Sequence, residues 1–398
     1  MFVVRIALRA LLVAALLIVP VKTAVAQADA PVVTLPAPTG SESIGVVSLH
    51  LVDENRVDEV LNNGRKREFP LRIFYPAVDA EKWPADTWAP EAVVDDFREY
   101  VTKYANGAGD WRLGNSHARV GAPAAAGPRP ILLYSPGFGS SSMVGAALIE
   151  ELVSHGYVVA ALDHPGDVGA VVFPGDRVVR QIPGIEVDLE SKLPGLVQAR
   201  VDDARYALDA LAAVVAGRNP DAEQRPLPAG LGGVLDLSSV GMFGHSLGGA
   251  TSAQAMLEDP RIRAGVDMDG SIFGSVRDAG VDRPFLLMSS GEGAFLNWEP
   301  SRRDFFEHSR GAKLAVALGD SLHMSFSDLQ VVLSQLAAAG VVPHEDAAKS
   351  IGTIPVTDSI DLQRGYLRTF FNTNFGRLAD SAQAPWQLAH PQMRLDRP

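Results

Sequence analysis

The chain has 398 residues, of which 47% are hydrophobic and 21% charged, a composition typical of a folded globular protein. Its formal net charge of −12 argues against a DNA or RNA partner, because nucleic-acid phosphates require clustered Lys and Arg side chains. The lack of cysteine excludes a disulfide scaffold, a thiolate nucleophile and cysteine-ligated metal sites.

The N-terminus has the pattern of an export signal. Arg5 and Arg9 precede an apolar run at residues 11–21, and an Ala-Val-Ala sequence that ends at Ala26 follows. The run is shorter than the roughly 20 residues that a membrane-spanning helix requires. We therefore expect residues 1–26 to be a signal peptide and the protein to be secreted or periplasmic. Its removal takes away three basic residues and no acidic one, so the exported chain is more acidic still.

The first part of the expected mature chain begins with a Pro-rich lead at residues 27–43. Two β-like stretches follow, residues 44–52 and 69–74, and a polar turn between them predicts an antiparallel pair. Residues 79–130 contain three tryptophans and several Pro and Gly residues. We interpret this segment as an insertion, similar to a cap, that lies over the sheet.

Short apolar runs without alternation recur through the rest of the chain, as expected of strands buried on both faces of a parallel sheet. They are residues 131–134, 157–162, 240–243, 264–268, 285–288 and 313–318. Helical patterns lie between them, the clearest at residues 197–211, and an amphipathic helix is predicted around residues 362–371. This order predicts a single α/β domain over residues 44–378, followed by a loose tail at 379–398.

Ser246 is the candidate nucleophile. It is the serine of a Gly-x-Ser-x-Gly pattern, Gly244 to Gly248, that directly follows the apolar run 240–243 and precedes a helical segment. The pattern alone is weak evidence, but a sharp turn from a buried strand into a helix exposes the serine hydroxyl at the positive helix end. The alternative is a serine that merely caps the helix.

A serine hydroxyl needs a histidine to take its proton and a carboxylate to orient that histidine. Four histidines follow Ser246. His308 lies in a charged helical stretch, His344 in a surface connection and His390 in the tail. His323 instead follows the last apolar run directly, at the sheet edge where active-site loops gather. We therefore predict His323 as the general base.

Two residues are candidates for the acid. Asp269 ends the apolar run 264–268, and Glu292 follows the next run, so both lie at the same expected edge of the sheet. The residues alone do not decide between them. Asp267 is a third candidate, although a hydrogen bond at the strand end explains it equally well.

An oxyanion of the tetrahedral intermediate requires two N–H donors. The residue after the nucleophile, Leu247, supplies one, and the loop at residues 135–139 is expected to supply the other through Phe138. Glycines on both sides of Phe138 permit a tight bend there. The alternative is an ordinary β-turn.

Six segments together carry a resemblance to a known family: residues 134–139, 155–159, 163–165, 244–249, 266–270 and 321–323. In these the chain resembles the secreted and type II platelet-activating factor acetylhydrolases of the α/β-hydrolase superfamily, over residues 44–375. The resemblance implies the α/β-hydrolase fold, with a mostly parallel sheet flanked by helices, and favours Asp269 as the acid. Polyester hydrolases and many lipases place the acid one strand later, where Glu292 lies. Pro136 stands where this family usually has the His of His-Gly-x-Gly.

The resemblance implies hydrolysis of carboxylic esters, with short acyl chains on a phospholipid or a similar small amphiphile, and with no metal or other cofactor. The sequence agrees, since it contains no His-Glu-x-x-His, no phosphate-binding Gly-x-x-x-x-Gly-Lys and no complete Gly-x-Gly-x-x-Gly. Asp163, His164 and Asp167 could ligate a metal, but we interpret them as a hydrogen-bond network of the loop.

Seven aromatic residues are candidates to line an acyl pocket or to contact a lipid surface transiently. They are Trp83, Trp88, Trp111, Phe138, Phe273, Phe295 and Trp298. Within enzymes, the alternative is a lipase, a polyester hydrolase or a dienelactone-hydrolase-like esterase that uses Glu292, although true dienelactone hydrolases need a cysteine nucleophile. The alternative outside enzymes is a binding protein on the same fold, which the complete set of catalytic residue types disfavours.

Overall fold

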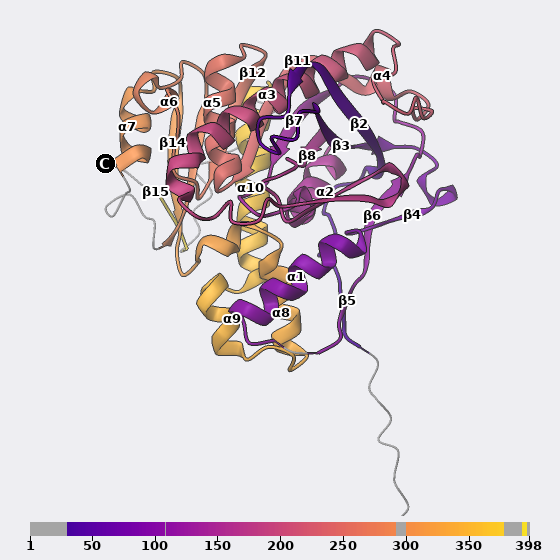
Figure 1. Cartoon of the computed structure of the whole chain (residues 1–398). Coiled ribbons are helices and arrows are strands. Elements are labelled where there is room, and N and C mark those ends of the chain that lie inside the picture. Colours follow the sequence, from indigo (N-terminus) through magenta and orange to yellow (C-terminus); the bar gives the residue numbers. More distant parts are fainter. Residues whose placement is uncertain (1–29, 108, 292–299, 378–391, 396–398) are drawn as a thin grey trace, which may run out of the picture.

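The computed structural model describes residues 30–107, 109–291, 300–377 and 392–395 (Figure 1). The predicted signal peptide, Glu292 and His390 lie outside the described residues, as do Phe295 and Trp298.

A single large sheet forms the centre of the molecule, in the strand order β15-β14-β13-β12-β11-β7-β8-β3-β2-β6-β4. The six strands from β14 to β8 are parallel throughout and correspond to the six apolar runs, which confirms that prediction. They are β7 (Arg129–Ser135), β8 (Val158–Leu162), β11 (Leu235–His245), β12 (Ile262–Met268), β13 (Phe285–Ser290) and β14 (Lys313–Leu318). Helices cover both faces of these strands, which is why their sequences lack alternation.

The expected antiparallel pair opens the fold. β2 (Ser43–Val57) and β3 (Lys66–Ala77) pair antiparallel, and β3 continues into the parallel strands by pairing antiparallel with β8. Both strands extend beyond the predicted runs because their ends remain paired where the sequence becomes polar.

The segment 79–130 does not lie wholly over the sheet. It begins with the short η1 (Ala80–Lys82), and its strands β4 (Ala85–Thr87) and β6 (Asn115–Val120) extend the sheet edge beyond β2. Its helix α1 (Glu91–Tyr104) lies at the end of the molecule with α8 (Leu329–Ala338) and α9 (His344–Ile351) (Figure 1). A further strand, β5 (Arg112–Leu113), pairs with β1 (Val32–Val33) of the Pro-rich lead.

The tail is not wholly loose either. β15 (Met393–Leu395) pairs antiparallel with β14 and forms the other edge of the sheet. Sequence reasoning missed this strand because three residues are too few to show a period. A second short hairpin, β9 (Ala170–Phe173) and β10 (Arg177–Arg180), lies apart from the main sheet.

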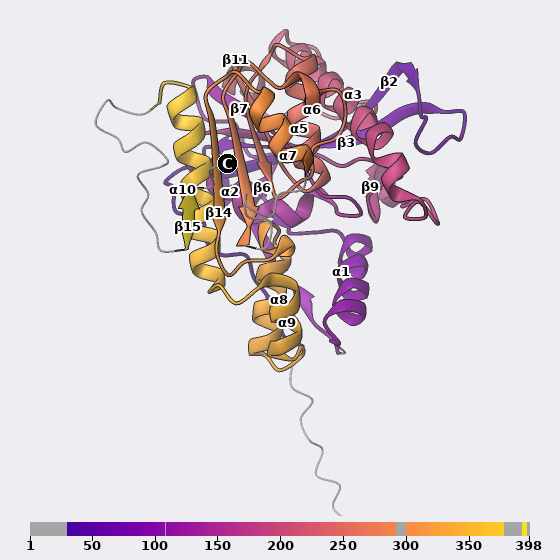
Figure 2. The ribbon, with the colours of Figure 1, turned by 90° about the vertical axis from the view of Figure 1, so that its left-hand side faces the viewer.

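Two layers of helices enclose the sheet (Figure 2). α2 (Ala146–Ser154) and α10 (Val356–Asn374) pack on one face. The other face is covered by α3 (Leu189–Val215), the short α4 (Leu231–Val234), α5 (Leu247–Glu258), α6 (Val276–Ala279) and α7 (Pro300–His308). Neighbouring strand residues alternate between two separate buried clusters, as Leu133 and Leu132 do, so each face has its own apolar core. Among the helices of the described ranges, none is both long and apolar enough to cross a bilayer.

Candidate active site

Ser246 lies at a strained turn between β11 and α5. Its φ of 55° and ψ of −121° fall in a region that side-chain-bearing residues rarely adopt, at a cost of about 1–3 kcal/mol. The Ser246 N–H donates to the carbonyl of Met268 in β12 at 2.9 Å, which fixes the bend to the neighbouring strand. The sharp strand-to-helix turn expected from the sequence is therefore present, and the serine side chain faces a cavity.

Close packing explains the two flanking glycines. A Cβ atom on Gly244 would lie 2.3 Å from the carbonyl carbon of Gly248. A Cβ atom on Gly248 would lie 1.9 Å from the carbonyl oxygen of Ser135, at the end of β7. Only glycine permits the helix, the turn and the loop after β7 to approach this closely.

Asp269 and His323 lie in the same cavity as Ser246. Asp269 directly follows β12, and His323 begins the short helix η6 (His323–Phe326) after β14. The Nδ1 of His323 is 2.8 Å from the Oδ2 of Asp269. Because a carboxylate only accepts, Nδ1 carries the proton and Nε2 is left as an acceptor. The three residues line one cavity because β11, β12 and β14 are parallel, so their carboxyl ends share one edge.

Asp269 stays ionised over a wide pH range. Burial alone raises its pKa, but the hydrogen bond from His323 and the charge of Arg302 outweigh that effect and lower the pKa to about 2. The N–H of Ser290 also donates to the carboxylate, at 2.7 Å. Arg302 lies on α7, with a guanidinium nitrogen 3.7 Å from Asp269 Oδ1. No motif singles out Arg302 in the sequence.

His245, the residue before Ser246 in the motif, contacts His323. Its Nε2 is 3.0 Å from the backbone carbonyl of His323, and the two rings lie 4.5 Å apart. Since a carbonyl only accepts, this nitrogen is the protonated one. Burial, and next the proximity of the His323 imidazole, lower the pKa of His245 to about 3, so the His245 ring is neutral at physiological pH.

Asp267 has a structural contact. Its Oδ1 accepts the N–H of Gly270 at 2.8 Å, just after the strand end. A Cβ atom on Gly270 would lie 2.2 Å from the carbonyl oxygen of Ser246, so this turn packs directly against the serine. The contact agrees with the strand-end role considered for Asp267.

Phe138 and Leu247, the predicted oxyanion donors, both line the cavity. Within the described part of the chain, neither backbone N–H donates to another protein group. The neighbouring Gly139 is hydrogen-bonded in both directions, to Asp167 and to Gly169.

The cavity has a volume of about 960 Å³. Of the seven candidate aromatic residues, Phe138 and Phe273 line it. Trp88 and Trp111 do not, because they are buried in the core beneath α1, and Trp83 is partly exposed near the sheet edge. Sequence reasoning cannot tell such core aromatics from pocket aromatics, since both are apolar.

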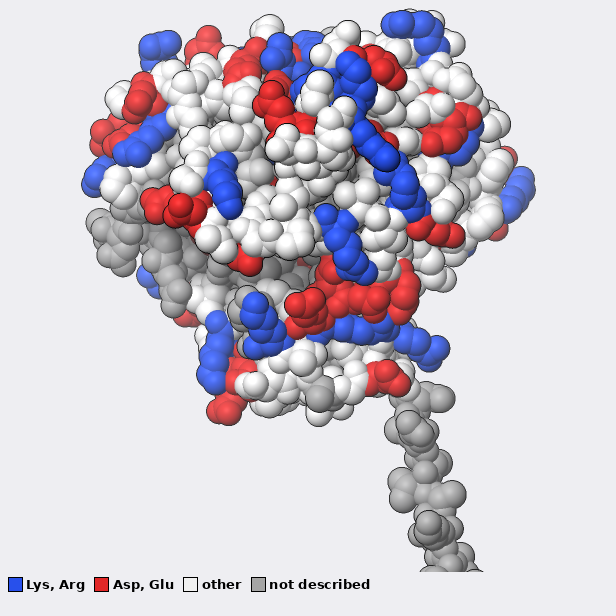
Figure 3. Space-filling view, in the orientation of Figure 1, with Lys and Arg blue, Asp and Glu red and all other residues white. Residues whose placement is uncertain are grey.

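Side chains of both charges surround the cavity. Asp96, Glu99 and Lys103 come from α1, and Arg180 and Glu186 come from the segment that follows β9. On the face shown in Figure 3, acidic and basic side chains are interspersed, and no broad basic area is present among its described residues.

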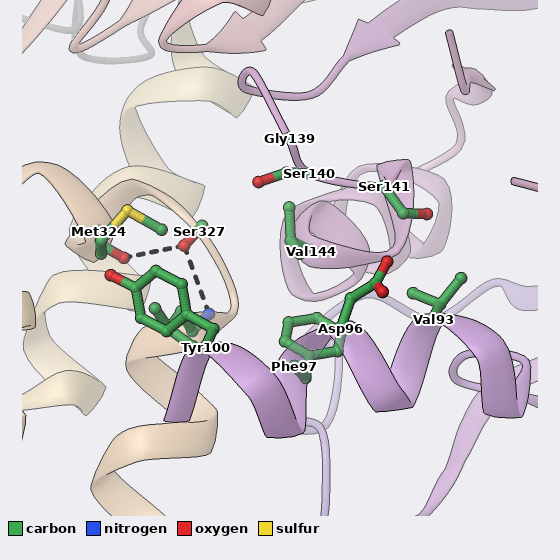
Figure 4. Close-up of a pocket in the computed structure, with 11 residues that line it drawn as sticks. Val93, Asp96, Phe97, Tyr100, Gly139, Ser140, Ser141, Val144, Met324 and Ser327 are labelled. Carbon is green, nitrogen blue, oxygen red and sulfur yellow. Dashed lines mark hydrogen bonds between the residues drawn. The ribbon is translucent and has the colours of Figure 1, made fainter. Parts of the chain in front are cut away.

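A smaller pocket of about 70 Å³, lined by apolar side chains together with Asp96 and three serines, adjoins the cavity (Figure 4). The residues that line both spaces are Asp96, Tyr100, Gly139, Ser140 and Met324. Its apolar side chains come from α1, η2 (Ser142–Gly145), η6 and α8. They are Val93, Phe97, Tyr100, Val144, Met324 and Leu329. A small group bound beside the loop at residues 135–139 would fill it.

The loop residues that could be mistaken for metal ligands form a hydrogen-bond network, as predicted. Asp163 accepts from Ser141 Oγ at 3.1 Å, and Asp167 accepts from Arg200. His164 Nδ1 lies 3.0 Å from Asp203. Among the described residues, no group of three acidic or histidine side chains is arranged to hold a metal ion.

The fold and site define an α/β-hydrolase of the esterase class. In structure, the chain is similar to a ferulic acid esterase from Streptomyces cinnamoneus, with a TM-score of 0.73 and 27% identity over 92% of this chain and 99% of that one. In sequence, it is 26% identical over 377 residues to a probable 1-alkyl-2-acetylglycerophosphocholine esterase of Arthroderma benhamiae, covering 86% of this chain and 89% of that protein. It is also 25% identical to the platelet-activating factor acetylhydrolase of Cavia porcellus, covering 70% and 68% of the two chains.

A sequence model of the family described as "Platelet-activating factor acetylhydrolase, isoform II" matches residues 28–351. The chain therefore belongs to this family and is an enzyme that hydrolyses carboxylic esters.

Proposed function

We propose that the protein is an exported serine esterase in which Ser246, His323 and Asp269 form the catalytic triad. The observation that carries the proposal is the His323–Asp269 hydrogen bond inside the cavity that Ser246 lines, with Ser246 in a strained turn. Such pre-set geometry is typical of an activated nucleophile.

The residues support a two-step reaction. Ser246 Oγ attacks the ester carbonyl carbon while His323 Nε2 takes its proton, and the carbonyl oxygen becomes an oxyanion near the N–H groups of Phe138 and Leu247. The C–O bond then breaks, and the imidazolium gives its proton to the departing alcohol. Water attacks the acyl-enzyme in the same way and releases the acid, which restores Ser246. Asp269 remains ionised and stabilises the imidazolium in both steps.

The smaller pocket supports short-chain acyl esters as substrates. A space of about 70 Å³ holds only a few groups the size of a water molecule. Its position beside Gly139 and Ser140 places it next to the expected oxyanion site. The larger cavity is then left for the alcohol part of the ester. The names of the related proteins, a probable 1-alkyl-2-acetylglycerophosphocholine esterase and a platelet-activating factor acetylhydrolase, suggest that this part is a phospholipid. An aromatic ester is the second candidate, since the structural neighbour is a ferulic acid esterase.

Two measurements test this proposal. A fluorophosphonate probe should label the mature protein once, and peptide mapping should place the label on Ser246. Esters of p-nitrophenol with two, four and eight acyl carbons, a phospholipid with a short sn-2 chain and a feruloyl ester should then be compared. Preference for the shortest chains supports the proposal; labelling at another serine, or no hydrolysis of any ester, contradicts it.

Export is a separate part of the proposal, supported by the charge and apolar pattern of residues 1–26. Expression of the full sequence in a bacterium should give a protein outside the cytoplasm whose N-terminus is residue 27, as measured by intact-mass spectrometry. Full-length protein retained in the cytoplasm contradicts export without bearing on the esterase.

A further inference from the structure

A fully buried cation lies behind the oxyanion loop. Arg200 of α3 has no exposed surface, whereas Gly137 and Phe138 of the loop line the cavity. The Arg200 guanidinium donates to the carbonyl of Pro136 at 2.5 Å and to that of Gly137 at 3.3 Å. Two consecutive carbonyls of the loop are thus held from the interior.

Asp167 holds Arg200 in place. Its two carboxylate oxygens accept from the Nε and Nη2 of Arg200 at 2.7 and 2.6 Å, which is the bidentate geometry that fixes a guanidinium plane. The backbone carbonyl of Asp167 also accepts the N–H of Gly139, at 3.0 Å. The peptide groups on both sides of Phe138 are therefore tied to one ion pair.

The contact between Arg200 and the Gly137 carbonyl also sets the direction of the Phe138 N–H. The carbonyl of Gly137 and the N–H of Phe138 belong to one trans peptide group, so they point in opposite directions. The Gly137 carbonyl accepts both the Ser140 N–H, at 3.2 Å, and the Arg200 guanidinium, at 3.3 Å. Since Arg200 donates to it from the interior, the N–H of Phe138 points away from Arg200, toward the cavity side of the loop. We propose that Arg200, fixed by Asp167, positions the Phe138 N–H for the oxyanion. The proposal rests on the proposed esterase function.

A purely structural ion pair is the competing explanation, because a buried Arg must be paired wherever it lies. The two explanations differ in what a conservative change does. Lysine keeps the charge, but its single ammonium cannot serve a carboxylate and two carbonyls in the fixed fork of a guanidinium. A structural role predicts a loss of stability alone, whereas a positioning role predicts a loss in the transition state as well.

The first test is Arg200→Lys. We expect kcat for p-nitrophenyl acetate to fall by about 10–100-fold with little change in KM, somewhat less than the loss of a whole oxyanion donor. Phenylboronic acid forms a tetrahedral adduct on the serine, so its affinity should fall by the same factor. An unchanged kcat, or an unchanged boronate affinity, overturns the proposal.

Arg364→Lys is the matched control. Arg364 of α10 is also buried and donates to backbone carbonyls, those of Pro36 and Ala147, but on the opposite face of the sheet. It should lose stability while kcat stays near the wild-type value. Equal losses of kcat in both variants overturn the proposal.

Two further measurements keep the proposal testable if Arg200→Lys does not fold or the enzyme has another substrate. Asp167→Asn keeps the size of the side chain and removes the charge that orients Arg200, so a smaller loss of the same kind is expected. Amide exchange at Gly139 reports loop order without any turnover and should be faster in Asp167→Asn than in wild type. Unchanged exchange overturns the positioning role, whereas a wild-type protein inactive on every ester contradicts only the proposed function.

Discussion

Two Ser-His-Asp arrangements lie in this molecule, and only one of them is accessible. Ser135 Oγ lies 3.0 Å from His164 Nε2, and His164 Nδ1 lies 3.0 Å from Asp203. All three side chains are buried, with exposures of 0%, 1% and 0%. The side chain of His323 is 48% exposed in the cavity. Hydrogen bonds among the three residue types are therefore not sufficient to define a catalytic site.

The surroundings of the two sets differ in two further ways. Ser135 lies in the regular strand β7, whereas Ser246 has a positive φ at a helix N-terminus. Burial and the charge of Arg200 lower the pKa of His164, so its ring is neutral and fixed between Ser135 and Asp203. The buried set lacks access for a substrate, while the open set combines a strained serine, a polar cavity and N–H donors.

Replacing each of the two serines by alanine should give the greatest difference in activity between the two sets. Ser246→Ala should lower kcat by at least about 10⁴-fold, because the nucleophile is lost and only binding and oxyanion contacts remain. Ser135→Ala should leave kcat nearly unchanged and lower the melting temperature, since it removes a buried hydrogen bond. Ester hydrolysis and thermal unfolding measure both. Full activity in Ser246→Ala would reverse the comparison.

The second comparison is between the aspartates of the two sets, Asp269 and Asp203. Asp269→Asn should lower kcat by about 10⁴-fold, because the amide no longer fixes the His323 tautomer or stabilises its charge. Asp203→Asn should act mainly on stability, since Asp203 also pairs with Arg67 in the interior. Steady-state kinetics on the soluble fraction of each variant distinguishes the two outcomes.

Glu292→Gln is the control for the choice of acid. It should retain activity if Asp269 is the acid. A large loss in Glu292→Gln together with a small one in Asp269→Asn would assign the acid to the later strand.

A smaller change is expected in the acyl-chain preference of the open site. Val93→Ala enlarges the smaller pocket, so the preference for hexanoate over acetate esters should rise by about tenfold, the lower range for one methylene. Val101→Ala is the matched control, because Val101 is a buried valine of the same helix that packs in its core away from the pocket. Equal chain-length profiles in both variants contradict the acyl role of the pocket.

The smallest change concerns how the free energy of unfolding depends on pH through His164, the histidine of the buried set. The lowered pKa of His164 means that the unfolded chain binds its proton more readily, so this contribution is present above about pH 6.5 and is lost as pH falls below it. The free energy of unfolding should fall by up to about 1.4 kcal/mol per pH unit for this group. Urea unfolding between pH 7.5 and 4.5 should show a flatter slope in His164→Asn. Ser135→Ala keeps His164, so its stability should depend on pH as that of the wild type does. If wild type, His164→Asn and Ser135→Ala all show the same pH dependence, His164 does not contribute it.

Much of the fold was accessible from the sequence because the strands are buried on both faces. Uninterrupted apolar runs identify the six parallel strands, and their order places the ends of β11, β12 and β14 at one edge. The motif around Ser246 and the position of His323 after β14 follow from the same reasoning. The assignment of their catalytic roles stays a prediction until the variants are measured.

Other features depend on contacts between distant segments. β15 is too short to show a period, and β4 and β6 join the sheet from a segment expected to lie over it. No local sequence pattern identifies Arg302 or Arg200, although Arg302 lies 3.7 Å from Asp269 and Arg200 donates to the carbonyl of Gly137. Their roles arise only when helices far along the chain pack against the strand ends.

Local patterns were enough to predict the class of fold, the sharp turn at Ser246 and the candidate residues, because hydrophobic periodicity and glycine spacing are read from short stretches of the chain. The tertiary structure decided which serine, histidine and aspartate face a cavity. Ser135, His164 and Asp203 have the same residue types, and their His–Asp distance of 3.0 Å is close to the 2.8 Å between His323 and Asp269, but the packing of β3, β7 and α3 around them excludes solvent. Access is a property of the packed molecule, since it depends on which surfaces the distant elements cover.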